Sequence, residues 1–154
     1  MSNKFTMALL CLLLLAGCTS LTPEKYVGEQ VGLELPEAIS VEQSDSHGGF
    51  HGDGLRLDTL AFSPEDGQEI EEQITGRGDV WNEGPFDEYL GGILYDGGPA
   101  EEGGWPRSPE RCWWFFWDRH QDQDIPLDER YSWNYTAALY DGDTCTLYYL
   151  KFDT

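Results

Sequence analysis

The run Cys112–Trp117 is the feature that most limits the folds open to this chain of 154 residues. It reads Cys-Trp-Trp-Phe-Phe-Trp, so both of the faces that a strand presents are apolar. A strand of this kind is typical of a sheet that is covered on both sides. We therefore predict that Cys112–Trp117 is a central strand of a buried sheet.

Two further runs predict a β-hairpin near the carboxyl end. Ser132–Tyr140 and Thr144–Phe152 are rich in aromatic and β-branched residues, and Asp141-Gly142-Asp143 joins them. Asp-Gly between two such runs is a strong short-range hairpin signal.

Two shorter strands are predicted in the amino-terminal half. Ile39 and Val41 alternate with polar residues, which indicates a short strand with one buried face. Leu55–Phe62 also has strand composition, but its apolar positions change parity midway. We therefore expect a bulge or a twist there.

Helix signals follow the second of these strands. Ser63 is a good N-cap, Pro64 suits the first helical position, and acidic residues fill the first turn, where the helix dipole favours them. Ile70 and Ile74 lie one turn apart on the expected buried side, and Phe86–Leu94 is a candidate for a second, short helix. Together the patterns predict an α+β fold, an antiparallel sheet of about five strands with one main packed helix.

The amino terminus predicts export. Met7–Ala16 is an uninterrupted apolar run, too short to span a bilayer, which needs about 20 residues, but long enough for the core of a signal peptide. The tetrapeptide Leu15-Ala16-Gly17-Cys18 that ends it resembles the lipobox of bacterial lipoproteins. That resemblance implies cleavage before Cys18 and a diacylglyceryl group, with fatty acids such as palmitate, on its thiol. The alternative is a plain secretory signal with a cysteine near its cleavage site.

These signals divide the chain into three expected parts. Residues 1–17 are the lipoprotein signal peptide. Residues 18–37 are the lipidated amino terminus and a tether, because prolines and glycines interrupt any period there. A short docked piece around Tyr26 and Val27 is the alternative within this stretch. Residues 38–154 are a single α+β domain.

A second resemblance rests on four strings of the expected domain. They are His47–Gly54, Asp118-Arg119-His120, Asn134–Asp141 and Thr146–Tyr149. Together they are similar to a group of small lipoproteins from Firmicutes-type bacteria. The resemblance implies a place at the bacterial cell membrane, lipid-anchored and facing outside the cytoplasm, and it implies no activity.

The charge excludes one class of function. The chain has 9 Lys and Arg against 29 Asp and Glu, a formal charge of -20. A nucleic-acid binder that works by phosphate neutralisation needs the opposite balance, so no nucleic-acid partner is expected. The 14% of aromatic residues also exclude an acidic disordered tail.

Two cysteines remain in the expected domain, Cys112 and Cys145. In an oxidising compartment a disulfide between them is expected, with a contribution of about 3 to 4 kcal/mol to stability. The alternative is a pair of reduced, buried thiols.

The loop from His47 to Asp53 is a candidate metal site. His47, His51 and Asp53 lie within seven residues of one another, and His120 would be a fourth ligand of a tetrahedral zinc ion. The interleaved glycines also suit a tight turn that the polar side chains close. The spacing favours the turn, because zinc sites usually show cysteine pairs or a helical histidine spacing.

Trp81 and Trp105 are the two tryptophans predicted in loops. Their rings are candidates for stacking on a glycan or a peptide, although a small sheet also needs such rings for its core. No nucleophile elbow, phosphate-binding glycine loop or helical His-Glu pair is present. We therefore assign no catalytic residue and no cofactor.

The expected function is that of a membrane-anchored, non-enzymatic module that binds an envelope protein or a glycan. One alternative is a glycan or peptide binder that uses the loop tryptophans. The other is a metal-binding envelope enzyme built on the loop from His47 to Asp53.

Overall fold

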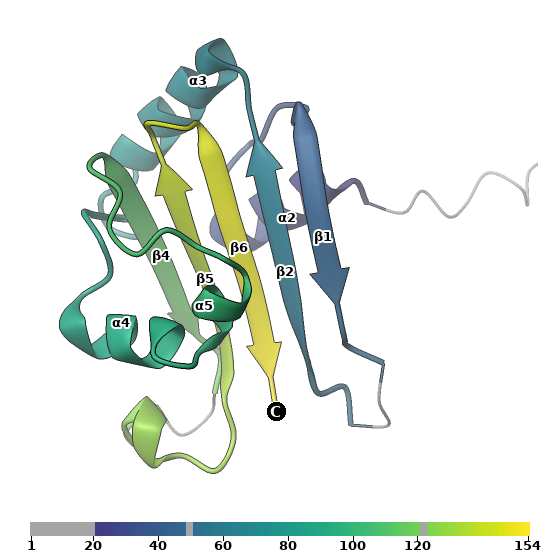
Figure 1. Ribbon diagram of the computed structural model, residues 1–154, viewed down its shortest axis with the longest axis vertical. Coiled ribbons are helices and arrows are strands. Elements are labelled where there is room, and N and C mark those ends of the chain that lie inside the picture. The colour runs from purple at the N-terminus through teal and green to yellow at the C-terminus, as the bar shows by residue number, and fades with distance from the viewer. Residues whose placement is uncertain (1–20, 49–50, 121–122) are drawn as a thin grey trace, which may run out of the picture.

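Six antiparallel strands form one open sheet in the computed structural model, which describes residues 21–48, 51–120 and 123–154 (Figure 1). Their order is β1-β2-β6-β5-β4-β3. The strands are β1 (Ser40–Asp45), β2 (Gly54–Ala61), β3 (Asn82–Glu83), β4 (Cys112–Asp118), β5 (Asn134–Asp141) and β6 (Thr146–Asp153). The predicted α+β class and the antiparallel sheet are confirmed.

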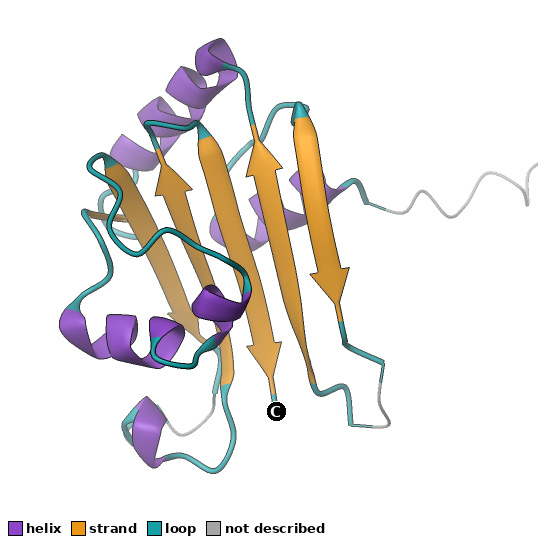
Figure 2. Ribbon diagram, viewed as in Figure 1, coloured by secondary structure: helices purple, strands orange, loops and turns teal. Residues whose placement is uncertain are grey.

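Helices cover both faces of this sheet (Figure 2). Helices α2 (Pro23–Val31) and α3 (Pro64–Thr75) lie on one face, which we call the α2/α3 face. Helices α4 (Glu88–Tyr95) and α5 (Pro99–Glu102) lie on the other, the α4/α5 face, and a short 3-10 turn, Leu127–Glu129, packs its leucine there. No helix among the described residues combines the length and the apolar character needed to cross a bilayer.

The apolar strand β4 is buried from both sides, as predicted. Trp113 and Phe115 belong to the core under α2 and α3, whereas Cys112 belongs to the core under α4 and α5, with Trp114 and Phe116 packed against it. Its expected central place was wrong, because β4 pairs only with β5 and with the two residues of β3. The central strands are β5 and β6, which form the predicted hairpin.

Both predicted helices are confirmed, and each begins at a capping side chain. The Ser63 hydroxyl accepts a hydrogen bond from the Asp66 N–H at 3.1 Å at the start of α3. The Asp87 carboxylate accepts one from the Leu90 N–H at 2.8 Å at the start of α4. These bonds satisfy backbone groups that the first helical turn leaves without partners.

Strand β2 has no bulge, contrary to expectation. Its register with β6 is continuous along the whole strand. Leu55 and Leu57 pack toward the α4/α5 face and Leu60 packs on the α2/α3 face, and the buried Asp58 accounts for the apparent change of parity. Strand β1 also differs from expectation, because all of its residues are exposed and none of its faces is buried.

The expected tether was wrong where the structure describes it, and the alternative of a docked piece around Tyr26 and Val27 is confirmed there. Helix α2 packs Val27 and Val31 into the core, with exposed fractions of 0% and 1%, and Leu33 follows at 5%. The folded part of the chain therefore includes residues 23–37 and does not begin at Ala38. The signal segment and Cys18 lie outside the described residues.

Gly67 gives a test of the packing between α3 and the β5–β6 hairpin. A Cβ atom at Gly67 would lie 2.5 Å from Cys145 Sγ and 3.0 Å from Tyr140 Oη, so α3 or these side chains must shift to accept it. We expect Gly67→Ala to lower the free energy of unfolding by about 1–3 kcal/mol, although alanine favours helices. Urea unfolding measures this change.

Gly92→Ala in α4 is the matched control, because a Cβ atom there meets only Asp96 Oδ2, at 3.9 Å. It should raise stability by about 0.5–1 kcal/mol. Equal gains from both substitutions would contradict the close packing at Gly67.

Candidate functional site

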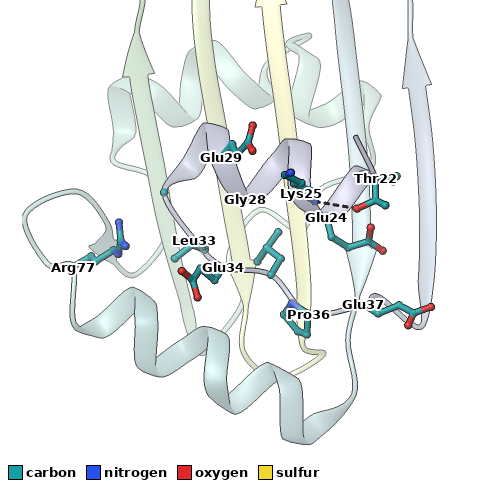
Figure 3. Close-up of a pocket in the computed structure, with 13 residues that line it drawn as sticks. Thr22, Glu24, Lys25, Gly28, Glu29, Leu33, Glu34, Pro36, Glu37 and Arg77 are labelled. Carbon is teal, nitrogen blue, oxygen red and sulfur yellow. Dashed lines mark hydrogen bonds between the residues drawn. The ribbon is translucent and has the colours of Figure 1, made fainter. Parts of the chain in front are cut away.

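A groove of about 900 Å³ lies along helix α2 on the side away from the sheet, with α3 on its other side (Figure 3). Its floor is the segment that follows α2, with Leu33, Leu35 and Pro36. The full lining is Thr22, Pro23, Glu24, Lys25, Gly28, Glu29, Gly32, Leu33, Glu34, Leu35, Pro36, Glu37 and Arg77.

Two glycines make the floor of the groove possible. Gly32 ends α2 with a φ of 74°, a left-handed conformation that favours glycine, and turns the chain back along the helix. The Leu33 N–H then donates to the Gly28 carbonyl at 2.9 Å. A Cβ atom at Gly28 would lie 2.5 Å from the Leu33 carbonyl oxygen, so only glycine permits this approach.

Gln73 of α3 fixes the other side of the floor. Its Oε1 accepts the Glu34 N–H at 2.8 Å, and its Nε2 donates to the Glu34 carbonyl at 2.9 Å. The paired bonds replace those that a neighbouring strand would make. The floor is thus held on both sides, by α2 and by α3.

Acidic side chains dominate the rim. Glu24, Glu29, Glu34 and Glu37 line the groove, against Lys25 and Arg77 as cations. Burial opposes ionisation of Glu24, but hydrogen bonds from its own backbone N–H, from the Ala38 N–H and from Thr22 outweigh it and lower its pKa. The groove therefore combines an apolar floor with a negative rim and has no histidine or cysteine in its lining.

A second polar cluster occupies the part of the α2/α3 face near the carboxyl end of β6. Asp153 is its centre, with ion pairs to Arg119 at 2.7 Å and Lys151 at 3.2 Å and a hydrogen-bond contact to His47 Nε2 at 3.1 Å. His47 Nδ1 also contacts Asp45 at 2.7 Å. Burial opposes ionisation of Asp153, but the hydrogen bonds and charges of Arg119 and Lys151 outweigh it and lower its pKa.

Arg56 connects this cluster to helix α2. Its guanidinium lies 3.8 Å from the centre of the Tyr26 ring and makes two hydrogen bonds to Asp58, at 2.6 and 3.1 Å. Asp58 is fully buried, and this burial raises its pKa in spite of the charge of Arg56. The pair gives a buried carboxylate the partner that it needs in a low-dielectric site.

The predicted metal ligands do not converge on one point. His47 pairs with two aspartates, His120 Nε2 lies 3.0 Å from Ser132 Oγ, and His51 and Asp53 are exposed. The part of the chain that the structure describes contains no group of three His, Cys, Asp or Glu side chains that could hold a metal ion. His47 instead closes the turn after β1. This is the alternative to a metal site that the interleaved glycines of the loop indicated.

The two tryptophans expected at a binding surface are core residues. Trp81 is 2% exposed and donates its indole N–H to the Val31 carbonyl, and Trp105 is 5% exposed. Their loops fold back onto the sheet, so neither ring is available to a ligand. The exposed tryptophan is instead Trp117, at the end of β4, whose exposed fraction is 50%.

The expected disulfide is absent from the structure. Cys112 and Cys145 are both free thiols. Cys112 is buried in the core of the α4/α5 face, whereas Cys145 packs against the core of the α2/α3 face. The sheet separates the two sulfur atoms, and a disulfide needs Cβ atoms about 4 Å apart.

Sequence reasoning missed the groove because it assigned residues 18–37 to a tether. The available signal was the helix start Thr22-Pro23-Glu24, with Val27 and Val31 four residues apart.

No family model matches the chain. A search of curated proteins and a search of solved structures found no match to it either.

Asp153→Asn tests the charged cluster. At neutral pH we expect a loss of about 2 kcal/mol in the free energy of unfolding, because hydrogen bonds to a charged group are lost. The lowered pKa of Asp153 stabilises the fold above the ordinary value of 3.8 and ceases to do so as the pH falls through the folded-state pKa. Denaturant unfolding of variant and wild type should therefore converge at acid pH.

Asp96→Asn is the control for this measurement. Asp96 pairs with Arg107 at 2.8 Å, but both side chains are more than half exposed, so the change should stay within about 0.5 kcal/mol. If Asp153→Asn lowered the free energy of unfolding by the same amount at neutral and at acid pH, this result would contradict the electrostatic account.

Proposed function

We propose that this protein is a lipid-anchored binding module outside the cytoplasm, without enzymatic activity, and that it binds a basic, partly apolar segment of an envelope protein in the groove beside α2. The observation that carries the proposal is the groove itself, with an apolar floor, an acidic rim and a frame that is already held by hydrogen bonds.

The chemistry of the groove supports binding rather than catalysis. Its four glutamates outnumber its two cations, and the whole chain carries a formal charge of -20, so a cationic partner is attracted both locally and from a distance. Leu35 and Pro36 of the floor, both half-buried, offer apolar contact area. A frame formed in advance reduces the entropy that a ligand loses on binding.

The position of the groove is compatible with a lipid anchor. Thr22, on its rim, follows the expected lipidation site Cys18 by four residues, which span at most about 14 Å when extended. A bilayer surface would thus lie close to the groove. The groove would therefore meet segments of a partner that lie near the membrane. Anionic lipid headgroups would repel the acidic body of the protein.

Cys18→Ser tests the anchor. We expect the wild-type chain to incorporate radioactive palmitate in a bacterial host and to enter the membrane fraction, and Cys18→Ser to lose both properties, because the thiol is the expected attachment point. Cys11→Ser, in the same segment, is the control and should be labelled like the wild type. Labelling of Cys18→Ser would overturn the lipid anchor.

A labelled peptide of alternating Lys and Leu residues tests the groove. We expect it to bind the wild-type protein in a fluorescence anisotropy titration, and the corresponding Glu and Leu peptide not to bind. Glu29→Lys with Glu34→Lys should weaken binding about tenfold or more, since a tenfold change needs only about 1.4 kcal/mol.

The control variant carries Glu102→Lys with Glu110→Lys, two exposed residues outside the groove that change the net charge by the same amount. It should bind nearly as well as the wild type. Equal weakening by both double variants would show that only the overall charge matters and would overturn the groove as the site.

A further inference from the structure

His47 connects two strands that are not neighbours in the sheet. Its backbone N–H and its ring Nδ1 lie 2.9 and 2.7 Å from Asp45 Oδ1, on the last residue of β1. Its ring Nε2 lies 3.1 Å from Asp153 Oδ2, on the last residue of β6. Figure 1 shows that β1 and β6 end at the same end of the sheet, with β2 between them. The His47 ring therefore crosses β2 to reach both carboxylates.

Gly54, the first residue of β2, leaves room for this crossing. It lies opposite Asp153 in the register of β2 with β6. A Cβ atom at Gly54 would lie 2.6 Å from the His47 backbone N and 2.8 Å from its ring Cγ. The His47 side chain is only 19% exposed in this position. The contact with both carboxylates therefore depends on a residue without a side chain at the start of β2.

A neutral imidazole cannot make both ring contacts as hydrogen bonds. It carries one N–H, and its other nitrogen is an acceptor. The nitrogen without a proton would direct its lone pair at a carboxylate oxygen, and the two groups would repel each other. Neither carboxylate supplies the missing proton. Burial opposes the ionisation of Asp45 and Asp153, but hydrogen bonds and neighbouring charges outweigh it and lower the pKa of both.

We propose that His47 is an imidazolium in the folded protein and forms a pH-dependent latch between the end of β1 and the end of β6. With both nitrogens protonated, Nδ1–H donates to Asp45 and Nε2–H donates to Asp153, and both hydrogen bonds are charge-assisted. Strand β1 buries none of its residues, so it lacks the core contacts that hold the inner strands. When the ring loses one proton, one of the two bonds is lost and β1 is held less firmly.

The charged groups around the latch come from four segments. They are Asp45 of β1, Arg56 of β2, Asp153 and Lys151 of β6, and Arg119, which follows β4. Arginine and lysine keep their charge below about pH 9, and both carboxylates, whose pKa is lowered, are ionised above the ordinary value of 3.8. Among these groups and His47, only the imidazole changes its charge between about pH 5.5 and 8.5. Asp58 and Tyr26 contact Arg56, and a comparison with a variant of His47 cancels their own titration.

The latch stabilises the fold at mildly acid pH. A histidine in an unfolded chain gives up one of its two ring protons near about pH 6.5. Because the folded state favours the charged ring, the stabilisation is complete below that pH and is lost as the pH rises and the folded protein also releases the proton. This direction is opposite to that of Asp153, whose contribution is lost as the pH falls. The latch is independent of the groove, which lies beside α2.

His47→Gln tests the latch, because glutamine keeps an N–H donor but cannot take up a second proton. We expect this substitution to raise the equilibrium constant for urea unfolding of the full chain about tenfold at about pH 5.5, since a charge-assisted hydrogen bond is lost. The difference from the wild type should shrink as the pH is raised to about 8.5. His51→Gln, at an exposed residue of the same loop, is the control and should change the constant less than about twofold at either pH.

NMR of the histidine ring nitrogens gives a second measurement and uses the wild-type chain. Both nitrogens of His47 should stay protonated to a higher pH in the folded protein than in the urea-unfolded chain. Loss of the proton at the same pH in both states would overturn the proposal. So would an equal effect of His47→Gln on unfolding at the two ends of the pH range.

Discussion

The burial of both faces of the β4–β5–β6 sheet is the constraint on which the rest of the structure depends. Strands whose side chains are apolar on both sides need a layer of helices on each side. The chain provides α3 for one face and α4 with α5 for the other, and α2 completes the first layer. Tyr26 of α2 meets the buried Tyr149 edge to face, with ring centres 6.0 Å apart. Helix α2 is thus a structural part of the sheet's cover, and the groove exists because α2 is fixed there.

The same constraint explains the charged cluster. Helix α2 covers only part of the α2/α3 face, and toward the carboxyl end of β6 the side chains change from tyrosine and leucine to lysine and aspartate. Arg56 marks the boundary, because it stacks on Tyr26 and also neutralises the buried Asp58. The network around Asp153 then holds the ends of β1, β5 and β6 together without a helix. Hydrogen bonds and neighbouring charges outweigh burial and lower the pKa of both Asp45 and Asp153, which favours the ionised carboxylates that hold this network together.

Much of the fold was accessible from local patterns, and the errors have physical causes. The capped helix at Ser63 and the hairpin across Asp141-Gly142 depend on neighbouring residues, so the sequence alone predicts them. The order of the strands, the docking of α2 and the burial of Trp81 and Trp105 depend on contacts between distant residues, which no local pattern encodes. The change of parity in β2 was misjudged because a buried aspartate was not expected opposite Tyr149. The groove was missed because helix α2 was missed. That helix is short and has glycines within it and at its end.

Hydrogen exchange of the full chain is the most direct test of the central claim that α2 is an integral part of the fold and builds the groove. The backbone N–H groups of α2 should be protected to nearly the same degree as those of β5 and β6, because the helix opens only when the shared core opens. Exchange over residues 23–31 at the rate of an unfolded chain, with β5 and β6 still protected, would contradict the claim and return this segment to the role of a tether.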